Sequence, residues 1–296
     1  GFDTEARHRE TGMIYNPAGY DINGYDKNGF NADGNHRATG MIYDRYGYTK
    51  DGYDKNGYTA AGVHRDDFIT LSAAGNTNLD GIWSNGTTMW VVDSSTDKIY
   101  AYNMITKERD EDKDFDTLIA AGNRGPTGIW SDGTTMWVLD NVNVKIYAYN
   151  MSTKAREDSK DISVSVIGTS VSDIWSNETT MWVSSGFQLA TDLYAYTIST
   201  RMAAGSDNFP IAANTAANSI WSDGITMWVA DGVRSTIDAY TLNSETRVSS
   251  KDITIAGSIV PQGIWSNGTT MWVADSSTDR IYAYNLASGA RPPKTE

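Results

Sequence analysis

The sequence predicts an all-β protein, a five-bladed β-propeller preceded by a repetitive stalk or solenoid-like segment. Three observations support this prediction. A phrase made of Ile-Trp-Ser, a polar turn and Thr-Met-Trp-Val occurs five times, starting at Ile82, Ile129, Ile174, Ile220 and Ile264. The copies recur every 44 to 47 residues, which is typical of a propeller blade built from short strands. All ten tryptophans belong to this phrase, so every copy carries them at the same strand positions.

Residues 1–66 repeat with a different period and form the predicted stalk. Residues 1–28 align without a gap on residues 29–56, and a third copy starts at Gly57. Glycine followed by an aromatic residue recurs about every five residues, which indicates regularly spaced turns. We expect the tyrosines to stack between successive turns or between chains, and a homotrimer joined through the stalk is a further expectation. A disordered linker is the weaker alternative, because disordered segments are usually poor in aromatic residues.

The stalk also contains part of a calcium-loop pattern. Oxygen-bearing side chains stand two residues apart before glycine at Asp21 and Asn23, and again at Asp26 and Asn28. A complete EF-hand loop ends in a bidentate glutamate, and none follows here at the right distance. Asp and Asn before Gly are also the ordinary choice for tight turns. Turn chemistry is therefore the preferred interpretation, calcium is the alternative, and we expect no other cofactor.

Residues 67–296 form the predicted propeller, and each unit has four pieces. In the second unit the outer, inner, middle and third strands are expected at residues 114–119, 128–131, 134–139 and 145–150. Asp132-Gly133 joins the inner and middle strands, and Asp-Gly is a strong hairpin pair because it tolerates positive φ. The middle strand is apolar on both faces, as expected of a sheet packed between two neighbours. A two-layer sandwich is the alternative fold, but it explains five equal units less well.

The order of the outer strands predicts how the ring closes. Outer strands are expected near Phe68, Phe115, Ile162, Phe209 and Ile253. One of them precedes the first inner strand, and none follows the last third strand. We therefore expect Phe68 to supply the outer strand of the fifth blade and to join the two ends of the domain.

The consensus Gly-Ile-Trp-Ser-Asp-Gly-Thr-Thr-Met-Trp-Val-Ala-Asp, followed by Asp-Arg-Ile-Tyr-Ala-Tyr-Asn, resembles the blades of NHL- and YVTN-type propellers across about residues 67–290. The number and length of the units are also similar to those of tachylectin-type lectins, without a sugar-site motif that can be transferred. The resemblance implies the fold and leaves the function open, because such propellers bind proteins, RNA or small ligands and occasionally catalyse.

Composition excludes several classes of partner. The net charge of −13 and a pI near 4.6 disfavour binding to nucleic-acid phosphates. No apolar run approaches the ~20 residues of a membrane helix, so we expect no membrane insertion. Without cysteine the chain forms neither disulfides nor thiolate metal sites. Because the chain starts at Gly1 and shows no signal peptide, we expect a processed protein or a fragment of a longer one.

Variable loops on one face of the ring are the expected binding site, because binding residues concentrate in loops held by a rigid scaffold. The candidate ligand-binding residues are Asp93, Asp140, Asp231, Asp275, Asn76, Asn123, Asn214 and Arg234. Capping of the same loops by the four aspartates is the preferred alternative interpretation. The tryptophans and the paired tyrosines are expected to pack between blades rather than to stack on sugars. We expect no catalytic residue, since the propeller contains no histidine for a Ser-His-Asp arrangement.

The sequence thus favours a non-enzymatic extracellular or cell-surface module. An adhesin or fibre tip would recognise a glycan or a cell-surface protein through the variable loops. A structural or protein-interaction scaffold within a larger repetitive protein is the alternative. A glycosidase is the least favoured hypothesis, because it requires two carboxylates about 5–9 Å apart at the central channel, whereas the loop aspartates repeat with the units.

Overall fold

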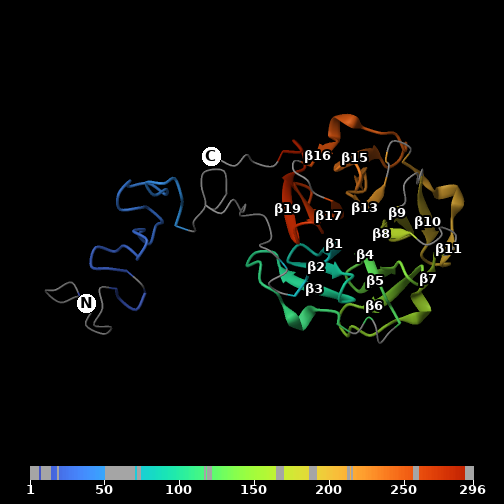
Figure 1. Ribbon diagram of the computed structural model, residues 1–296, viewed down its shortest axis with the longest axis horizontal. Coiled ribbons are helices and arrows are strands. Elements are labelled where there is room, and N and C mark those ends of the chain that lie inside the picture. The colour runs from blue at the N-terminus through green and yellow to red at the C-terminus, as the bar shows by residue number, and fades with distance from the viewer. Residues whose placement is uncertain are drawn as a thin grey trace. The chain divides into compact units, whose positions relative to one another are not determined.

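The chain divides into two compact units, Gly1–Asp67 with Pro292–Glu296 and Phe68–Arg291. The computed structural model (Figure 1) describes residues 7, 15–18, 20–50, 71, 75–116, 118, 122–164, 170–186, 192–211, 214, 216–255 and 260–290. Within these residues no helix has the length and hydrophobicity that a membrane crossing requires.

The described part of the first unit is a series of five-residue turns. Each turn is closed by two reciprocal hydrogen bonds between residues i and i+4. The backbone N–H of residue i donates to the carbonyl of residue i+4, and a side-chain oxygen of residue i accepts the N–H of residue i+4. Residue i is Asn16, Asp21, Asp26, Asn31 or Asp44. In four of these turns a glycine three positions after the Asx residue has a φ of 80–90°, which L-residues rarely adopt. The five-residue spacing in the sequence therefore corresponds to a turn closed by an Asx side chain.

The second unit is a five-bladed propeller, as predicted, with an antiparallel sheet in each blade (Figure 1). The inner, middle and third strands of blades one to three are β1 (Leu79–Ser84), β2 (Thr88–Asp93), β3 (Lys98–Asn103), β4 (Pro126–Ser131), β5 (Thr135–Asp140), β6 (Lys145–Asn150), β8 (Val171–Ser176), β9 (Thr180–Ser185) and β10 (Asp192–Thr197). Those of blades four and five are β13 (Ala217–Ser222), β14 (Thr226–Asp231), β15 (Thr236–Thr241), β17 (Pro261–Ser266), β18 (Thr270–Asp275) and β19 (Arg280–Asn285).

The ring has two faces that carry different connections. The turns from inner to middle strand and the turns that follow the third strand lie on one face, because Thr88 pairs with Asn103 at that end of the first blade. We call this the hairpin face. The loops from middle to third strand lie at the opposite end, where Asp93 pairs with both Leu79 and Lys98. We call this the loop face.

The ring closes between the fifth blade and the first. Each inner strand contacts the inner strands of two neighbours, in the order β1, β4, β8, β13, β17 and back to β1. Leu71 is buried among residues of the first and fifth blades, and its N–H donates to the carbonyl of Asp279 at 3.2 Å. This contact connects the start of the propeller to its last blade. Phe68, the residue expected to form the closing strand, lies outside the described residues.

The inner strands meet most closely at the residue before each Ile-Trp-Ser. This position is glycine in three blades, and a Cβ on Gly263 would lie 2.3 Å from the carbonyl oxygen of Asp80. Blades three and four carry Asp173 and Ser219 there instead. The Ser219 hydroxyl bonds to the Asp173 carboxylate and accepts the N–H of Ile264 at 2.9 Å. Two junctions are therefore filled by side chains where the other three have backbone against backbone.

The tryptophans pack inside the ring, as expected. The two indoles of each copy lie with ring centroids 5.2–5.5 Å apart. Eight of the ten are buried, whereas Trp83 and Trp221 are partly buried against the same clusters. Each enclosed indole removes roughly 150–250 Å² from water, so the repeat supplies much of the core.

The outer edges of the blades are shorter than expected. The outer strands β7 (Ile162–Ser163), β12 (Phe209–Pro210) and β16 (Ile253–Thr254) have two residues each, and β11 (Met202–Ala203) pairs with the far end of β10. A carboxylate replaces the backbone hydrogen bonds that a longer outer strand would make to the third strand. Asp161 accepts the N–H of Ala148 at 3.0 Å and pairs with Arg156. Asp114 and Asp252 do the same in their own blades. The sequence analysis missed this device.

Candidate functional site

The four predicted loop aspartates lie fully buried at the ends of the middle strands. Asp140 is representative: one carboxylate oxygen accepts the N–H groups of Val142 and Asn143 at 2.8 Å, and the other accepts the N–H of Arg124 at 2.7 Å. Asp93, Asp231 and Asp275 also accept N–H groups of their own loops. These bonds favour the capping interpretation. A ligand would have to displace them, and binding by these residues stays a prediction.

The other predicted residues on the loop face differ in their surroundings, and three of the four are buried. Asn76 and Asn123 are fully buried, each beside the hydroxyl of a buried tyrosine in a third strand. Asn214 is 5% exposed and donates to Asp238 at 3.4 Å. Arg234 pairs with the same carboxylate at 3.1 Å. The structure thus brings Asn214 and Arg234 together at Asp238 and encloses the two other asparagines, whose side-chain amide groups meet no hydrogen-bond partner among the described residues.

The metal candidates of the stalk belong to its turns. One oxygen of Asp21 accepts the N–H groups of Asn23 and Tyr25 at 2.9 and 3.0 Å, and its other oxygen pairs with Arg37. Asp26 accepts the N–H of Asn28 in the same way. Within the described ranges no three His, Cys, Asp or Glu side chains are grouped as a metal site would need. Turn chemistry accounts for the pattern at these residues, and calcium binding stays a prediction.

Two carboxylates on the inner strands interrupt the symmetry of the ring. Burial raises the pKa of Asp173 to about 7 and that of Asp80 to about 6. Asp173 is 3% exposed, and its carboxylate accepts the N–H groups of Ile174 and Ile220. A carboxylate enclosed in this way cannot contact a sugar, so the structure offers Asp173 no direct part in the glycosidase hypothesis.

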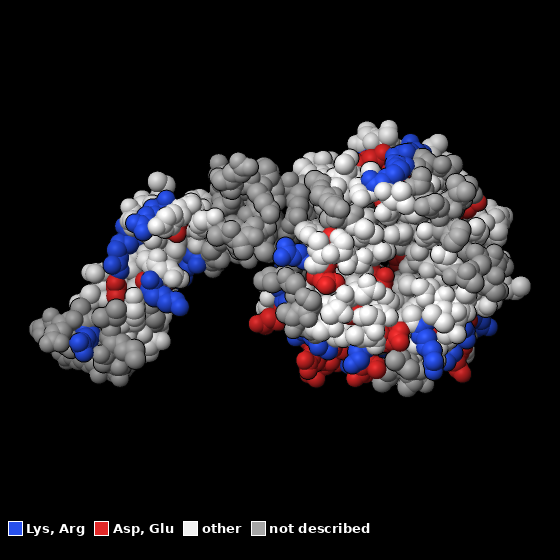
Figure 2. All heavy atoms as spheres, viewed as in Figure 1, with Lys and Arg blue, Asp and Glu red and all other residues white. Residues whose placement is uncertain are grey.

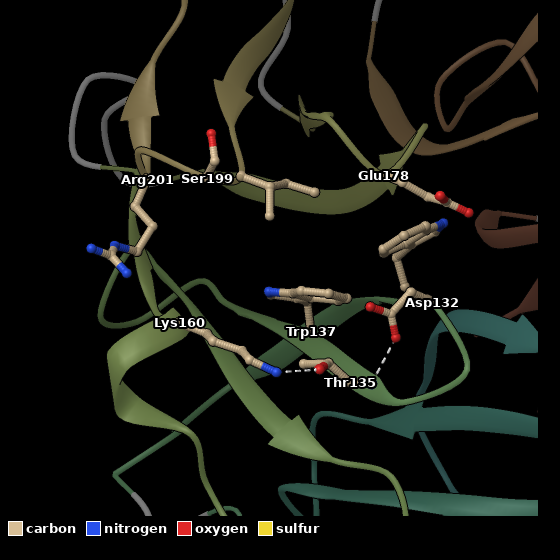
Figure 3. A pocket seen from close by; sticks show the side chains of 9 residues that line it. Asp132, Thr135, Trp137, Lys160, Glu178, Ser199 and Arg201 are labelled. Carbon is tan, nitrogen blue, oxygen red and sulfur yellow. Dashed lines mark hydrogen bonds between the residues drawn. The ribbon is translucent and has the colours of Figure 1, made fainter.

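A pocket of about 500 Å³ lies on the hairpin face between blades two and three. Blade two supplies both of its indoles, Asp132, Thr135 and Lys160, which ends the 3₁₀ turn η3 (Asp158–Lys160). Blade three supplies Glu178 from its hairpin and Ile198, Ser199 and Arg201 from the turn after β10. In the view of Figure 3, Lys160 and Arg201 lie on one side of the Trp137 indole, and Asp132 and Glu178 lie on the other.

The hydrogen bonds around this pocket hold its charges in place. The Lys160 ammonium donates to the Thr135 hydroxyl at 2.8 Å and to Glu157 at 2.8 Å. Arg201 donates to the carbonyl of Ser159. Burial raises the pKa of Asp132, but N–H and hydroxyl donors of the hairpin outweigh it and hold this pKa below its ordinary value. Asp132 is therefore ionised at neutral pH.

Glu178 adopts a backbone conformation that its side chain disfavours. The equivalent residues of the other four hairpins are glycines with φ of 87–91°, and Glu178 has φ 75°. A non-glycine residue in this region costs roughly 1–2 kcal/mol. Such strain concentrates at functional sites, and here the strained residue lines the pocket. Its replacement of glycine is visible in the sequence, but the pocket is not, and the site prediction omitted it.

The next junction contains a related pocket of about 260 Å³ between blades one and two. Asn85, Lys113 and Lys154 occupy there the places of Asp132, Lys160 and Arg201. The turns that follow the third strands thus vary among the blades at one position with positive φ, which is lysine in the first two and then arginine, glutamate and glycine: Lys107, Lys154, Arg201, Glu245 and Gly289. That variation is the sequence signal that could have revealed the hairpin face. Figure 2 also shows charged side chains gathered along the rim beside β3 and β6, with a mostly uncharged middle.

No protein-family model matches the sequence, and comparison with curated proteins finds no match either. A chain in the crystal structure of a nidogen–laminin complex is similar, with a TM-score of 0.51 and 13% identity over 72% of this chain and 78% of that chain. A catalytically inactive virginiamycin B lyase from Staphylococcus aureus with quinupristin gives a TM-score of 0.44 and 17% identity over 69% of this chain and 65% of that chain. The first likeness agrees with the β-propeller that the repeats predict, and at this identity it shows the fold alone.

Proposed function

We propose that the propeller is a non-enzymatic binding module for a glycan, and that the pocket between blades two and three is its binding site. The observation that supports this best is Glu178. It departs from glycine at a position where four other hairpins keep glycine, and its side chain lines the pocket. A repeat that otherwise preserves glycine at this hairpin position accepts backbone strain in the blade where the side chain lines this cavity.

The lining residues suit a sugar. Sugar rings present hydroxyl groups that donate and accept, together with apolar C–H faces. Carboxylates accept from hydroxyls, Thr135 and Ser199 offer hydroxyls of their own, and Lys160 and Arg201 donate. Ile198 and the indole edges supply apolar surface. The volume of about 500 Å³ falls within the ~300–1,000 Å³ usual for small-ligand sites.

The proposal places this module at a cell surface as an adhesin or fibre tip. The repetitive turns before the propeller support that role, because a regular array of turns can present a binding domain away from its anchor. The loop face remains a second surface on which the same glycan, or a surface protein, would be contacted through its variable loops.

Replacing Glu178 with glycine separates binding from folding. We expect Glu178→Gly to lower affinity for the recognised glycan at least tenfold, because a carboxylate that bonds sugar hydroxyls is lost. We expect the free energy of unfolding to stay equal or rise by up to about 1 kcal/mol, since relief of positive-φ strain is partly offset by the greater freedom of glycine in the unfolded chain. A glycan array followed by calorimetric titration of the strongest hit, beside guanidinium unfolding, measures both.

Glu245→Gln is the matched control for this variant. Glu245 also has positive φ, at 56°, and follows a third strand at the hairpin face without lining this pocket. The control should bind as the wild type does. Unchanged affinity in Glu178→Gly would contradict the proposed site, and silence of the whole array would contradict glycan binding.

Recognition of a protein is the second candidate. The likeness to a chain from a nidogen–laminin complex favours it, since that structure is an assembly of two proteins with a propeller of similar fold. A pull-down with surface proteins as bait decides between the two. Capture of one partner by the propeller, together with a silent glycan array, would favour protein binding.

A further inference from the structure

The charges of the pocket between blades two and three are separated, and this separation specifies the ligand further. Resting on the proposed function, we propose that this pocket binds an acidic sugar, with its anionic group between Lys160 and Arg201 and its hydroxyls toward Asp132 and Glu178. The anionic group is the carboxylate of a uronate or the sulfate ester of a sulfated hexose.

The end of the pocket that contains Lys160 and Arg201 is rich in donors. The ammonium keeps its place through Thr135 and Glu157, each at 2.8 Å. The guanidinium has five N–H donors, of which the carbonyl of Ser159 accepts from one nitrogen. Planar guanidinium and carboxylate groups match in a two-bond geometry, which makes arginine the usual partner of such anions. An anion placed here meets the Arg201 guanidinium and the Lys160 ammonium, whose charge Glu157 already neutralises in part.

A buried donor at the same end has no partner. Trp137 is 4% exposed, and its Nε1–H meets no acceptor among the described residues. The equivalent indoles Trp90 and Trp182 donate to backbone carbonyls at 3.1 Å, whereas that of Trp228 in blade four also meets no acceptor among the described residues. In Figure 3 the nitrogen of Trp137 points toward the end of the pocket that contains Arg201. An unsatisfied buried donor costs about 1–3 kcal/mol, but this nitrogen has no exposed surface, so a ligand oxygen reaches it only if the pocket wall moves.

The opposite end of the pocket rejects an anion and accepts hydroxyls. Asp132 is ionised, and one of its oxygens accepts the N–H groups of Thr134 and Thr135 at 2.8 Å. Glu178 adds a second carboxylate. Like charges repel, so a ligand carboxylate or sulfate is excluded from this end, and sugar hydroxyls are the groups that its oxygens accept from. The acidic sugar therefore has one orientation.

The equivalent positions at the other junctions of the ring show which of them suit an anion. Between blades three and four, Asp207 stands at the position of Lys160, and Glu245 stands at the position of Arg201. An anion would meet two carboxylates there. Between blades one and two the pair is Lys113 and Lys154, both of which line the second pocket. Lys251 of blade four stands at the position of Lys160, but the position of Arg201 in blade five is Gly289. Among the four junctions compared, a pair of cations therefore occurs at two neighbouring ones, which favours an acidic chain lying across blades one to three.

Arg201→Glu tests the proposal without risk to the fold, because blade four already carries glutamate at this position with nearly the same φ, 56° against 59°. Three probes of equal length are titrated by calorimetry: an oligogalacturonate, the neutral oligogalactose and a sulfated oligogalactose. We expect the wild type to bind one of the two anionic probes at least tenfold more tightly than the neutral one. We expect Arg201→Glu to weaken the preferred anionic probe at least tenfold more than it weakens the neutral probe.

The controls separate this inference from the proposed function. Glu245→Gln should leave all three affinities unchanged, and raising the salt from 0.15 to 0.5 M should weaken the anionic probes alone. Equal binding of neutral and anionic probes by the wild type would overturn the charge inference and leave the glycan site in place. Equal loss of all probes in Arg201→Glu would also overturn it. Failure of every probe, with a silent glycan array, would overturn both.

Discussion

Gly263→Ala is expected to destabilise the propeller by about 3 kcal/mol or more, because no space exists for a methyl group at the ring axis. A Cβ at this position would lie 2.3 Å from the carbonyl oxygen of Asp80 and 2.9 Å from the amide nitrogen of Ile82, both in the backbone of blade one. Overpacking that only moves side chains costs roughly 1–3 kcal/mol, and here two strands must separate. The change affects the junction at which the ring closes.

Guanidinium unfolding followed by tryptophan fluorescence measures this effect, since every tryptophan lies in the propeller repeat. Gly205→Ala is the matched control. Gly205 begins the 3₁₀ turn η5 (Gly205–Asp207), has no atom within 4 Å of an added Cβ and has no positive φ, so its change should stay within ~0.5 kcal/mol. If Gly263→Ala were as stable as this control, the close approach of the inner strands would be refuted.

The architecture was largely predictable because one phrase determines it five times. A period of 44–47 residues sets the blade, and the apolar middle strands require neighbours on both faces. The packing of the tryptophans followed from the same repetition. Closure was predicted from the order of the strands, and the bond from Leu71 to Asp279 shows the connection at one described residue. Residues that recur in every unit are those that all five blades need, and in this chain they are the residues that pack between blades.

The candidate site was harder to predict because it depends on what the copies do not share. The pocket forms between two blades, so its lining combines Lys160 from one unit with Arg201 from the next, 41 positions later in the chain. No single unit shows that pairing. The loop aspartates attracted interest by recurring, yet they are buried and accept N–H groups of their own loops, which favours a capping role. Glu178 and Asp173, which depart from their repeat, mark the two unusual places of the ring.

Asp173 should make the propeller less stable as pH rises from about 4 to 7. Burial raises the pKa of its folded-state carboxyl to about 7, whereas the ordinary pKa of an aspartate is 3.8. Between these values the folded protein retains a proton that the unfolded chain releases, so the folded state loses stability with each unit of pH. Below pH 4 both states are protonated, and above pH 7 both are ionised. At about 1.4 kcal/mol per unit, the loss between pH 4.5 and 8 is roughly 2–4 kcal/mol.

Asp173→Asn isolates this carboxyl from the other acids of a chain with a net charge of −13, which also gain protons on acidification. The amide cannot ionise, so the variant should show a flatter profile in unfolding experiments at pH 4.5, 6, 7 and 8 and constant ionic strength. It should also be less stable than the wild type at pH 4.5, because its NH₂ group meets either the N–H of Ile174 or that of Ile220. Asp80, whose pKa is raised to about 6, contributes a loss over a narrower pH range, from about 4 to 6, in both proteins. Parallel profiles for wild type and variant would show that Asp173 is ionised in the fold throughout, and that the axial hydrogen bonds offset its burial.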